Sequence, residues 1–134
     1  MGTWDVGIWD NDDAADWISE LSESRGLDLP HRSFNPTEVN GYYLEASEGA
    51  RVLCAADILL AALNRGGSSV PEAVSKWIDA NAGLDFQSLV PEALTRVRRV
   101  TAEHSELREL WEENEELFST WLARVEALAA SLEN

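Results

Sequence analysis

Hydrophobic residues recur at helical spacing in several stretches of the chain, and residues that favour helix ends separate these stretches. Ala14, Trp17 and Leu21 lie three or four residues apart, so they share one face of a helix predicted over residues 12–24. Gly26 follows directly after a basic residue, which is typical of a helix end. The first predicted element is therefore an amphipathic helix with one buried face.

The stretch over residues 43–63 is the most apolar of the chain and is hydrophobic on more than one face, which is typical of a helix at the centre of a bundle. Two shorter helices are predicted to begin at Pro71 and Pro91, because proline is well tolerated at the first position of a helix. A final hydrophobic stripe runs over residues 105–132, and Asn114 lies within it. One long helix and two helices with a kink between them are both consistent with this stripe.

These stretches predict an all-α fold, a single-domain bundle of about five helices over residues 1–134, long enough to bury a core without a metal or a disulfide. We expect the helix over 43–63 to lie centrally, flanked by the first helix and the C-terminal one. Residues 1–9 are predicted to form an ordered, extended segment, and residues 27–41, which contain two prolines, a long surface connection. Most tryptophans are expected to be buried, namely among Trp4, Trp9, Trp17, Trp77, Trp111 and Trp121.

The start of the first helix is dense in polar side chains that have two interpretations. Asp10, Asn11 and Asp12 compete for the position that caps the first turn, and carboxylates just inside the start, such as Asp16, favour the positive end of the helix dipole. Trp9 is placed to pack back onto that turn. Capping accounts for every residue type present and is the favoured interpretation. The alternative is a cation or polar-ligand site built from the same four polar side chains.

Asp57 has the most unusual position, since it lies inside the most apolar helix, between an alanine and an isoleucine. A buried lone carboxylate is costly, so Asp57 must reach a partner, water or the surface, and an arginine is the simplest partner. The cluster of Arg96, Arg98 and Arg99 is a candidate to meet Asp57 or the acidic first helix. Intramolecular pairing of these arginines is favoured over the recruitment of an anion.

Polar residues also mark the starts of the second and the last predicted helices. Glu45 lies a little over three turns before Asp57, on roughly the same side of the helix. Ser105 is a predicted N-cap, with Glu106 in the favoured first turn. The candidate binding residues are accordingly Asn11, Asp12, Asp16, Glu45, Asp57, Ser105 and Glu106.

The chain is strongly acidic, with 25 aspartates and glutamates against 10 lysines and arginines and a formal net charge of −15. This charge repels phosphate backbones and anionic lipid surfaces, so neither nucleic acid nor a membrane is an expected partner. No apolar run approaches the roughly 18 to 20 residues of a membrane span, and the N-terminus lacks the pattern of a signal peptide. A cytoplasmic protein is therefore expected, and a protein with a basic face is the partner that the charge favours.

Three short elements of the sequence resemble a bacterial family known as domain of unknown function 4259. The N-terminal element comprises Met1, Gly2, Trp4, Gly7, Trp9, Asn11, Asp12, Ala14, Asp16 and Trp17. The central helix carries Ala55-Ala56-Asp57, where the family pattern has glutamate in place of Asp57, and the last helix carries the run from Ser105 to Trp111. The resemblance covers nearly the whole chain and implies a shared fold, but it brings no established activity.

No catalytic arrangement is evident from the sequence. It offers no Cys–His or Ser–His–Asp spacing, no glycine-rich nucleotide loop and no paired cysteines for zinc, and the one cysteine, Cys54, is expected to be a buried thiol. An enzyme is therefore not the favoured interpretation, and no cofactor is predicted.

The sequence leaves two functions open. The favoured one is an acidic protein-binding module, monomeric or homodimeric, that acts as an inhibitor or immunity-type protein on a basic partner such as a nuclease. The alternative is a small-ligand or divalent-metal-binding protein, extending to a hydrolase, in which carboxylates of three helices converge. Hard oxygen ligands of this kind favour magnesium, manganese or calcium.

Overall fold

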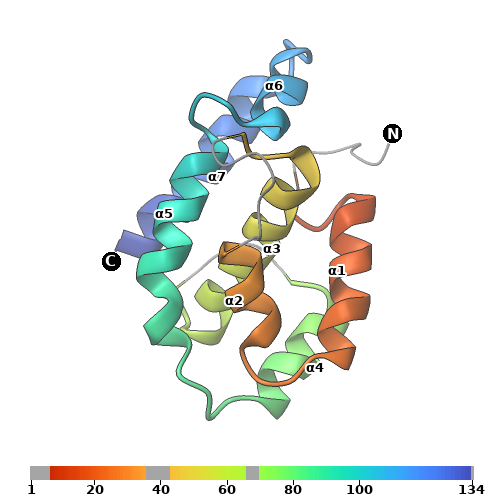
Figure 1. Cartoon of the computed structure of the whole chain (residues 1–134), viewed down its shortest axis with the longest axis vertical. Coiled ribbons are helices and arrows are strands. Elements are labelled where there is room, and N and C mark those ends of the chain that lie inside the picture. The colour runs from red at the N-terminus through yellow and green to blue at the C-terminus, as the bar shows by residue number, and fades with distance from the viewer. Residues whose placement is uncertain (1–6, 36–42, 66–69, 134) are drawn as a thin grey trace.

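The computed structural model describes residues 7–35, 43–65 and 70–133, and these residues form seven α-helices and one 3₁₀ helix (Figure 1). The elements are α1 (Asp12–Glu23), α2 (Asp28–Phe34), α3 (Ala46–Ala62), α4 (Glu72–Ala80), η1 (Phe86–Leu89), α5 (Val90–Val100), α6 (Glu106–Glu112) and α7 (Phe118–Glu133). The all-helical class is confirmed, whereas the expected number of about five helices is too low. Two features of the sequence account for the difference.

The first is α2, which falls inside the predicted surface connection, so that prediction is wrong for residues 28–34. Pro30 lies in the first turn of α2, where a missing N–H costs no helical hydrogen bond. Leu29 and Phe34 are buried in the core, and this burial stabilises a helix that is too short to form alone. Residues 36–41 of the predicted connection lie outside the described residues.

The second is a break in the C-terminal stripe at Asn114, which separates α6 from α7. The Asn114 N–H donates to the carbonyl of Trp111 at 2.9 Å and closes the end of α6. The Asn114 side-chain oxygen accepts from the Leu117 N–H at 3.2 Å, and its carbonyl accepts from the Phe118 N–H at 2.9 Å. Asn114 thus ends one helix and begins the next, and the stripe over 105–132 forms two helices.

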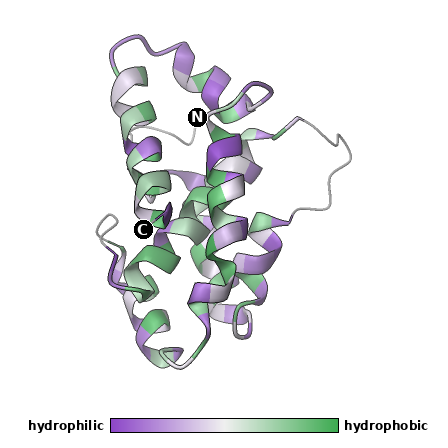
Figure 2. Ribbon diagram, turned by 90° about the vertical axis from the view of Figure 1, so that its left-hand side faces the viewer, coloured by the Kyte–Doolittle hydropathy of each residue, from purple (hydrophilic) through white to green (hydrophobic). Residues whose placement is uncertain are grey.

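The central position of α3 is confirmed, since α1, α2, α5, α6 and α7 all pack against it (Figure 1). Every residue from Val52 to Leu60 is buried, on all sides of the helix. The outer helices are amphipathic, and green and purple residues alternate along their ribbons in Figure 2. In the part of the chain that the structure describes, no helix has both the length and the apolar character to cross a membrane.

Tryptophan rings join the outer helices to one another. Trp111 of α6 stacks on Trp121 of α7 with ring centroids 6.0 Å apart and planes 14° apart. Trp17 of α1 donates its indole N–H to the Ser33 hydroxyl of α2 at 2.9 Å. These three tryptophans are buried, Trp9 and Trp77 are partly buried, and Trp4 lies outside the described residues.

The segment ahead of α1 is ordered where the structure describes it, but residues 7–10 form a turn rather than an extended run. The Asp10 N–H donates to the Gly7 carbonyl at 3.2 Å and closes this turn. Ile8 is buried in the core. The turn places Ile8 and Trp9 next to α3, where Trp9 bonds to Asp57.

Candidate functional site

One of the polar residues at the start of α1 caps the helix. Asn11 is the N-cap: its side-chain oxygen accepts from the Ala14 N–H at 2.8 Å, and its amide nitrogen donates to the Ile8 carbonyl at 3.2 Å. Asp12 lies in the first turn, and both Asp12 and Asp16 are exposed to solvent. The capping interpretation is confirmed for Asn11, whose side-chain amide bonds to backbone groups of Ala14 and Ile8.

Three further candidate residues meet where the starts of α3 and α6 lie side by side. Leu44 and Ser105 form an isolated parallel bridge, and the Glu106 N–H donates to the Leu44 carbonyl at 2.8 Å. The Glu106 carboxylate accepts from the Ala46 N–H, the first of α3, at 2.8 Å. Glu45 forms a reciprocal capping box at the same helix start. The junction therefore joins two helix ends through caps.

Ser105 is confirmed as the N-cap of α6. Its hydroxyl oxygen accepts from the Arg108 N–H at 3.3 Å, and the residue is fully buried. Glu106, Ser105 and Glu45 thus direct acceptor oxygens at backbone N–H groups of helix starts, which is the use that the positive end of a helix favours.

The structure does not bring the candidate carboxylates of three helices together in one site. The candidate residues divide among the start of α1, the junction of α3 with α6, and Asp57 in the middle of α3. Within residues 7–35, 43–65 and 70–133, no group of three or more histidines, cysteines, aspartates or glutamates is placed to hold a metal ion.

Asp57 is fully buried, and the expectation that it needs a partner is confirmed. Its Oδ2 accepts from the indole N–H of Trp9 at 2.8 Å. The Trp9 ring in turn lies 6.0 Å from the ring of Trp17, at a tilt of 56°. A neutral indole from the segment ahead of α1 therefore stabilises the carboxylate at the centre of α3, where an arginine had been expected.

The arginines of the predicted cluster bind groups within the chain, as expected, but the partners described below lie outside α1. Arg98 pairs with Glu133 of α7 at 2.7 Å. Arg96 donates to the Phe34 carbonyl at 2.7 Å, and Arg99 to the Glu103 carbonyl at 2.7 Å. These contacts tie α5 to α2, to α7 and to the loop before α6.

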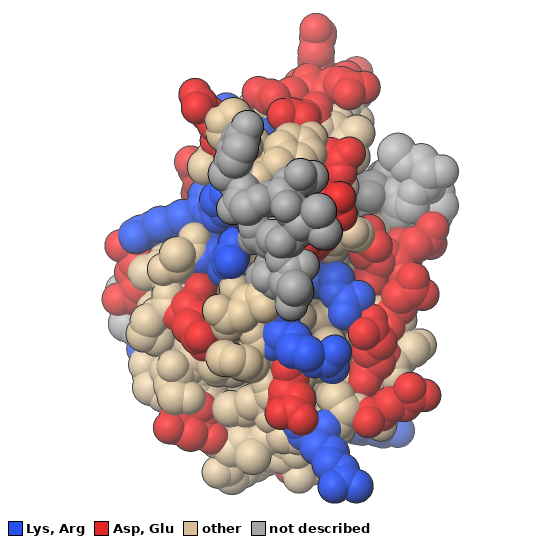
Figure 3. Space-filling view, in the orientation of Figure 1, with Lys and Arg blue, Asp and Glu red and all other residues tan. Residues whose placement is uncertain are grey.

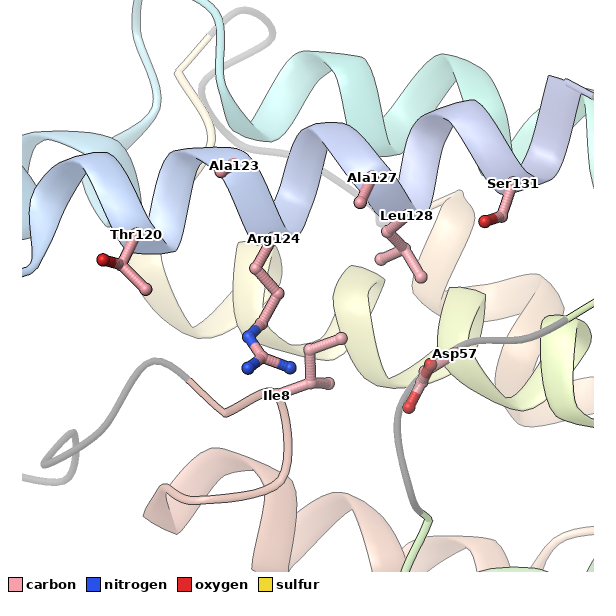
Figure 4. A pocket seen from close by; sticks show the side chains of 8 residues that line it. All are labelled: Ile8, Asp57, Thr120, Ala123, Arg124, Ala127, Leu128 and Ser131. Atoms are coloured by element: carbon pink, nitrogen blue, oxygen red, sulfur yellow. The ribbon is translucent and has the colours of Figure 1, made fainter.

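A cavity of about 410 Å³ lies between α7, α3 and the segment ahead of α1 (Figure 4). Ile8 and Asp57 form one wall, and residues of α7 form the other. Six residues of α7 line it, at the spacing of one helix face: Thr120, Ala123, Arg124, Ala127, Leu128 and Ser131. Figure 4 shows the Arg124 side chain extending from α7 toward Ile8, on the side where Asp57 lies.

Arg124 is the residue of this cavity that the sequence did not reveal. It is exposed, and with the residues that the structure describes it makes neither a hydrogen bond nor an ion pair. The sequence carries one signal for it, since Arg124 is the charged side chain on a face of α7 that otherwise consists of Leu128 and four small residues. The lining of the cavity thus includes Asp57, which the sequence singled out, and Arg124, which it did not.

Leu110 lies in α6 and is 49% exposed. Among the described residues it is the large hydrophobic side chain that is exposed to solvent. Exposed glutamates surround its position along the chain, and we call Leu110 together with these glutamates the acidic end: Glu109, Glu112, Glu113, Glu115 and Glu116. Figure 3 shows acidic side chains gathered over α6 at this end, and again along α1. The Glu109 carboxylate accepts from the Tyr43 hydroxyl at 2.9 Å, and this bond raises the pKa of Tyr43 above its ordinary value.

Cys54 is confirmed as a buried thiol. Its side chain is fully buried in α3, and burial raises the pKa of the thiol well above its usual range. A thiol in this state is protonated at neutral pH and does not act as a nucleophile.

The fold and its surfaces define a small, acidic, all-helical protein with one hydrophobic core. The chain belongs to the family described as Domain of unknown function (DUF4259), whose model matches residues 2–124. No curated protein and no solved structure matches it. The resemblance found in the sequence is confirmed at the level of the family.

Proposed function

We propose that this protein is a non-enzymatic binding module, of the inhibitor or immunity type, that docks through its acidic end on a basic face of another protein. The observation that carries the proposal is the exposed Leu110 among the glutamates of the acidic end. An apolar contact inside a charged rim is a common arrangement in protein interfaces, since the apolar group supplies affinity and the charges supply orientation and a fast encounter.

Two glutamates of the acidic end interact with other side chains of the protein. Glu109 accepts from Tyr43, and Glu112 lies 3.5 Å from Arg108. Glu113, Glu115 and Glu116 are exposed, and no described residue forms a hydrogen bond or an ion pair with their side chains. Because these three carboxylates repel one another, a basic partner gains electrostatic energy when it covers them.

The acidic end is also held in a fixed shape, which lowers the entropic cost of binding. Arg108 lies over the Phe118 ring, 5.8 Å from its centroid, and the stack of Trp111 on Trp121 fixes α6 on α7. The turn between the two helices is capped by Asn114. We therefore expect docking without a large rearrangement of α6.

The test is capture of the partner from a lysate of the native host, followed by affinity measurement with two matched variants. The first variant, Glu113→Gln with Glu115→Gln and Glu116→Gln, removes three charges from the acidic end. The second removes three exposed charges elsewhere, by Asp16→Asn, Glu23→Gln and Asp79→Asn. We expect the first to weaken binding at least about tenfold, or about 1.4 kcal/mol, and the second to change it much less. Equal effects, or the absence of a stoichiometric partner, would overturn the proposal.

A further inference from the structure

Arg124 has no hydrogen bond or ion pair with the residues that the structure describes. Four other basic side chains each lie 2.7 to 3.5 Å from a carboxylate: Arg51, Lys76, Arg98 and Arg108. Guanidinium groups bind anions through charge-assisted hydrogen bonds. The guanidinium of Arg124 is therefore able to bind an anion from solution without first breaking a pair with a described residue.

Helix α7 offers no carboxylate at the spacing that would pair with Arg124. The residues three and four positions away are Thr120, Trp121, Ala127 and Leu128. Trp121 is buried in the core, and the other three line the cavity together with Arg124 (Figure 4). The guanidinium thus lies beside a wall of hydroxyl and apolar side chains.

The cavity beside Arg124 fits a small molecule with an apolar tail. Its volume of about 410 Å³ falls in the range of ligand pockets, which are mostly apolar with a few polar groups. Ile8 and Leu128 supply apolar surface, and α7 lines the cavity over residues 120–131, a length of roughly 16 Å. Figure 4 shows Arg124 toward one end of this stretch and Leu128 toward the other. A ligand with its charged group on Arg124 therefore has space for a hydrocarbon tail along α7.

The charges of the protein favour an anionic group with a single charge. The guanidinium of Arg124 matches both carboxylates and phosphates with two parallel hydrogen bonds. A phosphate monoester carries about 1.5 to 2 negative charges at neutral pH, so a protein of formal net charge −15 repels it more strongly than a carboxylate. Asp57 also lines the cavity, but it is fully buried, is bonded to Trp9 and takes no part in binding. Its charge repels a second anionic group placed near it.

We propose that the cavity along α7 binds an aliphatic monocarboxylate, with its carboxylate on Arg124 and its hydrocarbon tail against Ile8, Ala127 and Leu128. No covalent step is involved. None of the residues that line the cavity belongs to the acidic end, so this inference and the proposed docking can each fail without the other.

The experiment is a calorimetric titration of the full chain with octanoate at pH 7. Three probes of the same chain length test the head group: 1-octanol, which has no charge, octyl phosphate, and octanedioate, which carries a second carboxylate. We expect octanoate to bind about tenfold more tightly than each of them. Hexanoate, which has a shorter tail, is expected to bind about fivefold more weakly than octanoate, because each buried methylene group adds affinity.

Two pairs of variants locate the carboxylate. Arg124→Gln is expected to weaken octanoate about tenfold and to leave 1-octanol unchanged, whereas Arg25→Gln, an exposed arginine outside the cavity, changes neither. Thr120→Glu places a carboxylate four positions before Arg124, where it pairs with the guanidinium, and is expected to weaken octanoate about tenfold. Ser119→Glu adds the same charge at the adjacent exposed position, which does not line the cavity, and is expected to have much less effect. The fold of each variant is checked by its thermal melt.

The inference is overturned by any of four results. These are the absence of binding by octanoate and hexanoate, binding of 1-octanol, octyl phosphate or octanedioate as tight as that of octanoate, equal effects of Arg124→Gln and Arg25→Gln, and equal effects of Thr120→Glu and Ser119→Glu. Tight binding of 1-octanol would show an apolar site in which Arg124 has no part, and tight binding of octyl phosphate would assign the guanidinium to phosphates.

Discussion

The indole N–H of Trp9 donates to Asp57 Oδ2 at 2.8 Å, and this bond joins the segment ahead of α1 to the centre of α3. This bond lowers the cost of burying a carboxylate inside an apolar helix, because it supplies a hydrogen-bond donor without burying a second charge. Ile8, in the same turn as Trp9, lies in the wall of the cavity, so the segment ahead of α1 contributes to both the core and this cavity.

Removal of this donor is expected to destabilise the protein measurably. Trp9→Phe keeps an aromatic ring but takes a hydrogen bond from a buried carboxylate, which costs about 1.5–3 kcal/mol of unfolding free energy. The control is Trp77→Phe, since Trp77 is also partly buried, packs on Phe86 at 6.0 Å, and makes no indole hydrogen bond with a described residue. Urea denaturation that shows equal losses in the two variants contradicts the role given to the bond.

Trp121 carries much of the packing between α6 and α7. It is buried and stacks on both Trp111 and Phe118, with centroids 6.0 and 6.1 Å away. Trp121→Ala is therefore expected to cost about 3–5 kcal/mol in chemical denaturation. Leu110→Ala, a truncation on the exposed side of α6, is expected to cost less than about 0.5 kcal/mol. A loss below about 1 kcal/mol for Trp121→Ala would place this ring outside the core.

Ser105 and Glu106 are expected to act on stability, since their acceptors cap α6 and α3. Ser105→Ala removes the acceptor of the Arg108 N–H and is expected to cost about 0.5–2 kcal/mol. Ser19→Ala, at an exposed position inside α1, serves as the control and is expected to change stability by less than about 0.5 kcal/mol. Thermal melts in which both variants match the parent protein would show that the cap contributes nothing.

The pair of Glu20 and Arg51 is expected to make stability depend on pH. Arg51 donates to both carboxylate oxygens of Glu20, at 2.7 and 2.9 Å, and these bonds lower the pKa of Glu20 below its ordinary value of 4.5. A lowered pKa in the folded state gives stabilisation that is complete above pH 4.5 and is lost as the pH falls through the folded pKa. Both side chains are 30–41% exposed, so the gain is about 0.5–1 kcal/mol.

The measurement for this pair compares Glu20→Gln with the parent protein at pH 7 and at pH 3. We expect the variant to be less stable at pH 7 and the difference to shrink at pH 3. Glu72→Gln removes a carboxylate of the exposed pair with Lys76 and is the control, with little change at either pH. A difference for Glu20→Gln that grows toward low pH has the wrong sign and contradicts the assignment.

The features that the sequence predicted well depend on local chemistry. Asn11 and Ser105 were recognised as competitors for helix starts because a cap needs only the next three residues. The centre of the bundle was recognisable because α3 is apolar on all sides. Asp57 was singled out for the same local reason, as a charge within that helix.

The features that it missed depend on tertiary contacts. The partner of Asp57 is 48 residues away in the sequence, and nothing near Trp9 indicates that its indole reaches α3. α2 forms because the core buries Leu29 and Phe34, although Pro30 is typical of a loop. Arg124 was overlooked because an exposed arginine is ordinary until the register of α7 sets it in the same cavity as Asp57.

The central claim, that the acidic end binds a basic partner, is tested most directly by the salt dependence of the dissociation constant. The captured partner is titrated at 50 and 500 mM sodium chloride, with the parent protein and with the variant that lacks the charges of Glu113, Glu115 and Glu116. We predict that salt weakens the parent complex at least about tenfold and weakens the variant complex much less, because exposed charges are screened at high salt. A dissociation constant of the parent complex that does not change with salt would contradict the claim.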